Sequence, residues 1–347
     1  MPQTSPHVLK SARHPPRYRT RFIVLLVLAA LCFIVSLGVG KYIITPFDVI
    51  KTLISPVFPM DDVTYQQWSA IFNMRLPRIC GAFLVGAALA TAGSSYQGMF
   101  QNPLVSPDIL GASAGAGFGA ACAIYTNQPD TIVTMFAFGG ALLSVAIAYV
   151  ISRVAKGNAT LSLVLGGILV GSLFGAATSY IKLVADTESQ LPEITYWLMG
   201  GLSSIDMDDV IFALIGIGIG VVPLLLLRWR MNVLTLGEDE ARSMGINTTR
   251  LRVVTILCAT LITAVAVSIS GVIGWIGLVI PHFCRMIFGY DYRRIIPASI
   301  IFGGAFLVLV DTAARTMASI EIPIGILTAF IGAPIFAYLL VVGGRRS

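Results

Sequence analysis

Long apolar runs dominate the chain, and polar residues gather in short stretches between them. A run of about 20 apolar residues is long enough to cross the hydrocarbon core of a bilayer as a helix. Ten such runs can be recognised, although one continuous stretch around residues 270–274 must be divided to give two of them. The predicted spans are Phe22–Gly40, Ile79–Gly98, Ile109–Tyr125, Ile132–Val154, Leu161–Val184, Val210–Leu227, Leu251–Ser270, Val272–Phe288, Ile295–Met317 and Ile322–Val342. The pattern therefore predicts an all-α membrane protein with about ten transmembrane helices.

Composition agrees with this prediction, since 56% of the residues are hydrophobic, only 12% are charged and the mean hydropathy is +0.86. A bilayer-embedded chain must avoid charge, because a charged side chain in hydrocarbon costs several kcal/mol. The first run is too long for a signal peptide and lacks a cleavage site of small residues, so we expect it to be retained. We expect residues 1–21 to form a basic tail and residues 22–346 a single membrane domain.

The distribution of basic residues predicts the orientation, because loops on the cytoplasmic side carry more Lys and Arg. With ten spans both termini lie on one side. Of the 23 Lys and Arg residues, 17 fall on that side and six on the other. We therefore expect both termini to be cytoplasmic, in the cytoplasmic (inner) membrane of a bacterium.

Patterns typical of a metal or nucleotide site are lacking in the sequence. The five cysteines lie in or near predicted spans without a CxxC pair, so a packing role is expected, and the three histidines form no cluster. The only Gly-Lys pair, Gly40-Lys41, is followed by Tyr42 rather than by the Ser or Thr of a phosphate-binding loop. If ATP drives transport, the ATPase is another chain.

An internal repeat is indicated by matching residues. Aligning Ala90–Gly111 with Ser268–Gly289 pairs Gly93 with Gly271, Pro103 with Pro281 and Gly111 with Gly289. Ten helices divide into two sets of five, and an odd number makes the halves run oppositely through the membrane. This predicts inverted five-helix repeats, a plan that many transporters use.

Glycines recur every four residues in the fifth predicted span, at Gly167, Gly171 and Gly175. This spacing places them on one face of a helix. Such a face allows another backbone to approach closely, or leaves width for a substrate pathway. The sequence alone favours packing for any single glycine and leaves both uses open.

Arg75 and Arg78 stand at the mouth of the second span, on the side that is otherwise poor in basic residues. Lying three residues apart, they would share a helical face, although Pro77 between them leaves their directions open. Arg315 comes from the same side of the ninth span. These arginines are expected either to contact a partner or to reach lipid headgroups.

Two further segments are predicted on the cytoplasmic side. In the first, Asn102 and Pro103 form a tight turn, and Asp108 is placed to cap the helix that follows. The second covers residues 234–248 and contains a short polar helix between Gly237 and Gly245. This helix is too short and too charged to span a membrane. It suits docking to another protein or serves as a plain connection.

These motifs together resemble the FecCD-type permease family, the membrane subunits of importers for iron-siderophores, haem, cobalamin and some oxyanions. The resemblance is carried by the Arg75–Arg78 mouth, Asn102-Pro103-Leu104, the Gly237–Gly245 segment, Gly274–His282, Ile322–Gly325 and Gly332-Ala333-Pro334. It extends from about residue 22 to residue 346. No single motif is specific, but their order and topological positions are.

The resemblance implies a transport subunit without catalytic residues. As partners it implies a second copy of the chain, two ATPase subunits that carry ATP and Mg, and an extracytoplasmic binding protein, with no cofactor, metal or nucleic acid bound by this chain. It implies ATPase coupling for Gly237, Glu238, Asp239, Glu240, Ala241, Arg242, Met244 and Gly245. It implies binding-protein docking for Arg75, Arg78 and Arg315. It implies a pathway lined by Gly167, Gly171, Gly175, Gly325, Gly332 and Pro334.

Two other classes of protein remain as alternatives. An ion-coupled secondary transporter usually needs ionisable groups within the membrane, and Asp186 and Asp311 are the only acids near a span interior. A membrane scaffold would not need the 234–248 segment. The cargo is not encoded in a pathway of small residues. We expect an iron-siderophore, the commonest cargo of the family, with haem, cobalamin and oxyanions as alternatives.

Overall fold

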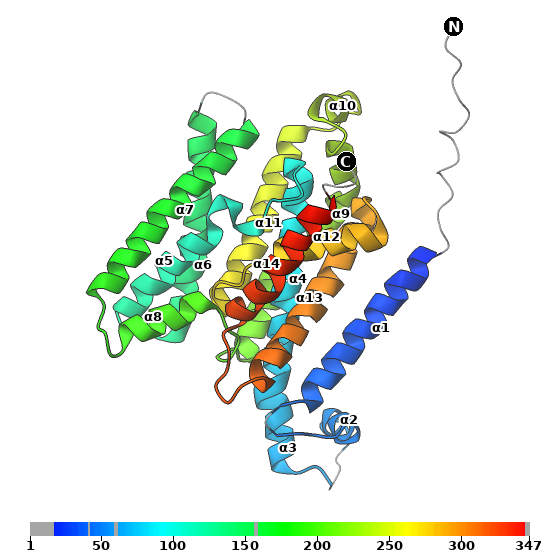
Figure 1. Ribbon diagram of the computed structural model, residues 1–347, viewed down its shortest axis with the longest axis vertical. Coiled ribbons are helices and arrows are strands. Elements are labelled where there is room, and N and C mark those ends of the chain that lie inside the picture. Colours follow the sequence, from blue (N-terminus) through cyan, green and yellow to red (C-terminus); the bar gives the residue numbers. More distant parts are fainter. Residues whose placement is uncertain (1–16, 41, 59–61, 156–158, 344–347) are drawn as a thin grey trace.

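The computed structural model describes residues 17–40, 42–58, 62–155 and 159–343, and every regular element in these ranges is a helix (Figure 1). The first half holds α1 (Arg17–Gly38), α2 (Pro46–Ile54), α3 (Tyr65–Ser69), the π-helical turn η2 (Ala70–Arg75), α4 (Leu76–Phe100), the 3₁₀ turn η3 (Pro107–Leu110), α5 (Ala112–Tyr125), α6 (Asp130–Val154) and α7 (Ala159–Val184). The second half holds α8 (Gln190–Met199), α9 (Met207–Leu234), α10 (Glu238–Ser243), α11 (Thr248–Ser270), α12 (Ile276–Phe288), α13 (Tyr292–Thr316) and α14 (Ile324–Gly343).

Seven of the described helical segments are long and apolar enough to cross a membrane. They correspond to α1, the continuous segment Tyr65–Phe100, α6, α7, α9, α11 and α13. Three shorter apolar helices, α5, α12 and α14, coincide with the remaining predicted spans. The chain is therefore a multi-pass membrane protein, and each of the ten apolar runs contains one of these helices.

One feature of helix length is shared by the two halves of the chain. The third apolar helix is short in each half, with 14 residues in α5 and 13 in α12. The residue pairing expected from sequence is nevertheless wrong in register. Gly93 lies inside α4 whereas Gly271 ends α11, and Gly111 precedes α5 whereas Gly289 follows α12. Glycine and proline are frequent in membrane helices, and these matches do not join equivalent positions.

Small residues let α4 lie at the centre of the bundle, against α13, α11 and α12 (Figure 1). A Cβ at Gly86 would overlap the carbonyl group of Gly303 in α13, and one at Gly93 would overlap Gly277 in α12. The backbones therefore meet directly, as is common where membrane helices pack through glycine. This contact fixes α4 relative to α12 and α13.

The long apolar stretch near residue 270 contains an extended break rather than a simple helix boundary. The predicted eighth span began at Val272, but α12 begins at Ile276, and residues 271–275 are not helical. Gly271 and Trp275 both have positive φ angles, 64° and 70°. The carbonyl oxygen of Ser270 accepts the N–H of Gly201 at 2.9 Å, so the backbone hydrogen bonds lost by the helix are partly replaced by a neighbouring segment.

Short helices cover the end of the bundle opposite α10 (Figure 1). The predicted spans leave residues 41–78 and 185–209 as connections, and the structure places α2, α3 and η2 in the first and α8 (Gln190–Met199) in the second. The side chain of Thr45 caps α2, and Thr64 forms a capping box with Gln67 at the start of α3. The π-helical turn carries the chain from α3 into α4.

Candidate functional site

Helix α10 is a single short helix at the end of the bundle where α9 ends and α11 begins (Figure 1). It follows Gly237, which has a φ of 135°, and it precedes Gly245, which has a φ of 79°. Residues other than glycine rarely adopt such φ angles, so the two glycines allow the chain to turn sharply into and out of this helix. The short polar helix expected between these glycines is thus present, while its coupling role stays a prediction.

The two faces of α10 differ in exposure. Ala241 is fully buried and anchors the helix on the bundle, whereas Asp239, Glu240, Arg242 and Met244 are exposed. Both acids lie in the first turn, where the helix dipole favours negative charge. Glu238 differs from them, since its carboxylate is held by Arg242 at 2.7 Å and by Arg252 of α11 at 3.0 Å. The exposed face is a polar surface on which another protein can dock.

The turn between α4 and α5 is built from local hydrogen bonds. The side chain of Asn102 accepts the N–H of Leu104 at 2.9 Å, and Pro103 follows the last residue of α4 by three positions. The carboxylate of Asp108 accepts the N–H of Ser113 in the first turn of α5, also at 2.9 Å. Asp108 also lines a cavity of about 290 Å³ between η3 and residues 272–278.

The glycine stripe of α7 changes its environment along the helix. A Cβ at Gly167 would overlap the carbonyl oxygen of Ile109, so this position packs against η3. Gly171 is half-buried, and a Cβ there would lie 3.7 Å from the Cα of Gly111. Gly175 is exposed, with nothing within 4 Å of an added Cβ. One end of the stripe therefore packs against a neighbouring backbone. Of these three glycines, only Gly175 lies in open space.

The α14 residues divide in the same way. A Cβ at Gly325 would overlap the carbonyl oxygen of Met199, and one at Gly332 would lie 2.5 Å from the Cβ of Trp275. Both glycines allow α14 to pack closely, on the end of α8 and on the non-helical residues 271–275. Pro334 lies inside α14 and is exposed. Gly175 and Pro334 are thus the members of the expected pathway set that the isolated chain leaves exposed.

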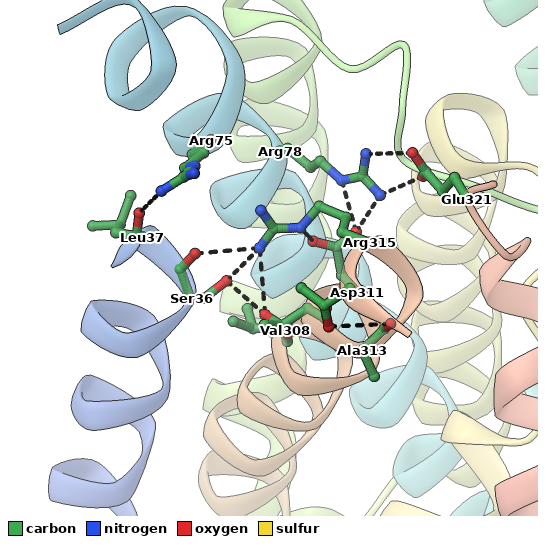
Figure 2. A network of polar contacts seen from close by, with 11 residues as sticks. Ser36, Leu37, Arg75, Arg78, Val308, Asp311, Ala313, Arg315 and Glu321 are labelled. Atoms are coloured by element: carbon green, nitrogen blue, oxygen red, sulfur yellow. Dashed lines mark hydrogen bonds and ion pairs between the residues drawn. The ribbon is translucent and has the colours of Figure 1, made fainter. Parts of the chain in front are cut away.

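The third region is a buried cluster of charges at the end of the bundle opposite α10, formed by Arg75, Arg78, Asp311, Arg315 and Glu321 (Figure 2). We call it the arginine cluster. Arg78 lies between two carboxylates: it donates to Asp311 at 2.7 Å and binds Glu321 through both terminal nitrogens. The Asp311 side chain is fully buried, whereas that of Glu321 is 28% exposed. The cluster therefore joins α4, α13 and the loop between α13 and α14.

The other two arginines tie α1 to this cluster (Figure 2). Arg315 lies 3.1 Å from the second oxygen of Asp311 and donates to the hydroxyl of Ser36 at 2.9 Å. Arg75 donates to carbonyl oxygens at the end of α1 and in the loop that follows, including that of Leu37. The sequence left the directions of Arg75 and Arg78 open. In the structure both guanidinium groups are buried and hydrogen-bonded within the chain.

Asp311 and Glu321 are the residues of this cluster that the sequence did not assign to a site. Asp311 stood out only as an acid in an apolar run, while its spacing of four residues from Arg315 would have predicted a helical ion pair. The pairing of Arg78 with Asp311 spans 233 residues and has no local signal. Because Asp311 is already ion-paired, it does not offer the free intramembrane carboxylate that ion coupling would use.

The chain is similar to the proteins of one known family. The profile of the FecCD transport family matches residues 26–342, which is most of the sequence. The chain belongs to the FecCD transport family. Its helical architecture and membrane character are therefore those of a family of transport proteins, as the sequence motifs suggested.

Similar members of the FecCD family differ in the cargo for which they are named. The molybdate import permease MolB of Haemophilus influenzae is 36% identical over 330 residues, covering 94% of this chain and 96% of the relative. A probable iron chelatin permease of Helicobacter pylori is 41% identical, covering 78% and 82%. The cobalamin import permease BtuC of Halobacterium salinarum is 42% identical, covering 77% and 72%.

One solved structure matches the whole FecCD chain closely. It is described as an inward-facing conformation of a metal-chelate type ABC transporter, and it superposes with a TM-score of 0.84 at 35% identity. The match covers 93% of this chain and 99% of the other. Because relatives of comparable identity carry different named cargoes, family membership does not determine the cargo of this chain.

Proposed function

We propose that the chain is the membrane-spanning permease of a binding-protein-dependent ABC importer, and that it forms the pathway for a metal chelate. The observation that carries this proposal is the full-length structural match to a metal-chelate type ABC transporter. An iron-siderophore is the first cargo to test, while haem, cobalamin and oxyanions would use the same architecture. The varied cargoes named for its relatives are the reason to test all of these candidates.

The proposed topology has ten spans arranged as inverted five-helix repeats, with both termini and α10 in the cytoplasm of a bacterium. The short third apolar helix of each half and the basic loops support it. In this arrangement the exposed polar face of α10 contacts a separate ATPase, which binds ATP and Mg. The arginine cluster then lies at the outer face, where a binding protein would dock.

A second copy of the chain completes the proposed pathway. The face of α7 that carries Gly175 also exposes Ile168 and Ser172, seven and three residues earlier. On α14, Phe330 is exposed on the same side of the helix as Pro334. Pairing of these faces between two copies would bury apolar surface around the open glycine and proline positions. Lipid would cover the same faces in a monomer, so cross-linking of Ile168→Cys in membranes distinguishes the two.

Docking through the arginine cluster would require an exchange of partners, because its guanidinium groups are already paired inside the chain. Glu321 is its part-exposed carboxylate, so an acidic residue of the binding protein would compete with Glu321 for Arg78. We therefore expect Arg78→Glu to abolish docking and Glu321→Gln to strengthen it. Unchanged affinity in both variants would leave the cluster with a structural role alone.

Uptake by the reconstituted complex tests the function. The permease would be placed in proteoliposomes with the ATPase and the binding protein, supplied with ⁵⁵Fe-siderophore, haem, cobalamin or molybdate, with and without ATP. The proposal expects uptake of one of these cargoes only when ATP and the binding protein are both present. Uptake driven by an ion gradient without the ATPase would contradict it and support a secondary transporter.

A further inference from the structure

A cavity of about 220 Å³ lies at the α10 end of the bundle, on the inner side of that helix. Its walls come from the end of α4, the end of α6, the start of α7, α10 and the start of α11. Segments from three separate parts of the sequence, residues 99–100, 149–163 and 238–256, therefore converge on one space. Glu238 and Arg242 also belong to the expected coupling segment, but the coupling role concerns the exposed face of α10 and not this cavity.

Positive charge is in excess around the cavity. Three arginines line it, one each from α6, α10 and α11, against the single carboxylate of Glu238. Glu238 is shared between Arg242 and Arg252, at 2.7 and 3.0 Å. Arg153 of α6 stacks over the ring of Tyr149, 6.0 Å from its centroid, and no carboxylate within the described part of the chain pairs with it. The cavity thus carries more positive charge than its own acid balances.

Hydroxyl groups and helix ends add to this character. Ser152, Thr160 and Thr249 line the cavity beside the arginines. Thr160 and Thr249 belong to the first turns of α7 and α11, two long helices whose N-terminal ends both face the space. The N-terminus of a helix carries a partial positive charge, so both helices add to the potential that attracts an anion.

We propose that this cavity binds a phosphate group, carried either by an anionic phospholipid or by a free phosphate ion. The planar guanidinium group of arginine matches the geometry of phosphate oxygens and forms charge-assisted hydrogen bonds with them. Arg153 of α6 and Arg252 of α11 both line the cavity and bind the anion, and Glu238 competes with it for Arg252. A bound phosphate would join the ends of α6 and α11 to α10. The position of α10 on the bundle would then depend on the occupant.

Two binding measurements on the purified, delipidated permease test this without any transport assay, so they remain valid if the proposed function fails. In the first, native mass spectrometry compares bound phosphatidylglycerol with phosphatidylcholine. In the second, the thermal unfolding of the permease is followed against inorganic phosphate, with chloride at equal ionic strength. A ligand that binds the folded state raises the unfolding temperature in a saturable manner. Selective phosphatidylglycerol binding identifies the lipid, and stabilisation by phosphate identifies the free ion.

Variants assign the binding to this cavity. Arg153→Gln and Arg252→Gln are each expected to weaken binding about tenfold, the effect of losing one charged hydrogen bond. Arg153→Lys should retain part of the affinity, and Glu238→Gln should increase it. Arg230→Gln is the matched control, because Arg230 is an exposed arginine of α9 that does not line the cavity. The proposal would be overturned if neither phosphatidylglycerol nor phosphate bound in a saturable manner. It would also be overturned if Arg153→Gln and Arg230→Gln weakened the binding equally.

Discussion

Asp311 provides the sharpest test of the arginine cluster, because its carboxylate is fully buried between two guanidinium groups. At 2.7 and 3.1 Å, and at an effective dielectric constant of about 20, each attraction amounts to roughly 5–6 kcal/mol before desolvation is subtracted. Asp311→Asn keeps the shape of the side chain and removes the charge. Glu321 is then the single carboxylate of the cluster, facing Arg78 and Arg315 together.

Removing one partner of a buried ion pair costs about 3–5 kcal/mol, because the remaining charge is left buried without compensation. We expect the apparent unfolding temperature of Asp311→Asn to fall by about 5–10 °C. Thermal unfolding in detergent, followed by intrinsic fluorescence, measures this change. The matched control is Asp62→Asn, which breaks an exposed pair with Lys51 whose Asp62 side chain is 80% exposed. Such surface pairs contribute at most about 1 kcal/mol.

A double variant separates the lost charge from a general packing defect. Asp311→Asn combined with Arg315→Gln removes one charge of each sign and leaves the Arg78–Glu321 pair intact. Its destabilisation should be clearly smaller than the sum for the two single variants, since each single change leaves a charge that the other removes. Strict additivity, or an Asp311→Asn variant as stable as Asp62→Asn, would refute the electrostatic explanation.

Three further predictions concern the other candidate sites. Gly245→Pro should distort the exit of α10, so that ATPase activity of the assembled complex continues while uptake falls; normal uptake would contradict the coupling role. Asp108→Ala should cost about 1 kcal/mol and lower the yield of folded protein, with Asp108→Asn as the control that keeps an acceptor; lost transport at full yield would instead indicate a functional role. Gly167→Ala should destabilise the chain by about 1–3 kcal/mol because its Cβ would overlap a backbone carbonyl. Gly175→Ala should not, and equal elution profiles in size-exclusion chromatography would refute this difference.

Hydropathy was sufficient to place a helix in each of the ten apolar runs, because burial in lipid is a property of composition and length. It did not distinguish helical from extended backbone inside one apolar stretch. Residues 271–275 are as apolar as a helix would be, yet the helix ends beside the segment near Gly200, where Gly201 donates to Ser270 and a Cβ on Gly200 would overlap the carbonyl oxygen of Val272. In the polar stretches between the predicted spans, hydropathy missed helices that are present. Helices α2 and α8 are short and amphipathic, and they lie outside the ten apolar runs.

Local motifs were recognised more reliably than long-range pairings. The glycines that bound α10 and the turn at Asn102 act through their own backbone and nearest neighbours, so their residue types were informative. The glycine stripe of α7 was ambiguous for a different reason. Whether Gly167 packs and Gly175 stays open depends on where η3 ends against the helix, and nothing in α7 itself encodes that position.

The arginine cluster shows why charge bias alone was an incomplete guide. Arg75, Arg78 and Arg315 were conspicuous because they lie on the side that should be poor in basic residues, which suggested a partner outside the chain. Their partners are instead Asp311, Glu321 and the end of α1, supplied by segments far away in sequence. A buried guanidinium needs such compensation, whatever else it does. Any docking role for these arginines must therefore release a bond that already holds α1, α4 and α13 together, which couples partner binding to the stability of the bundle.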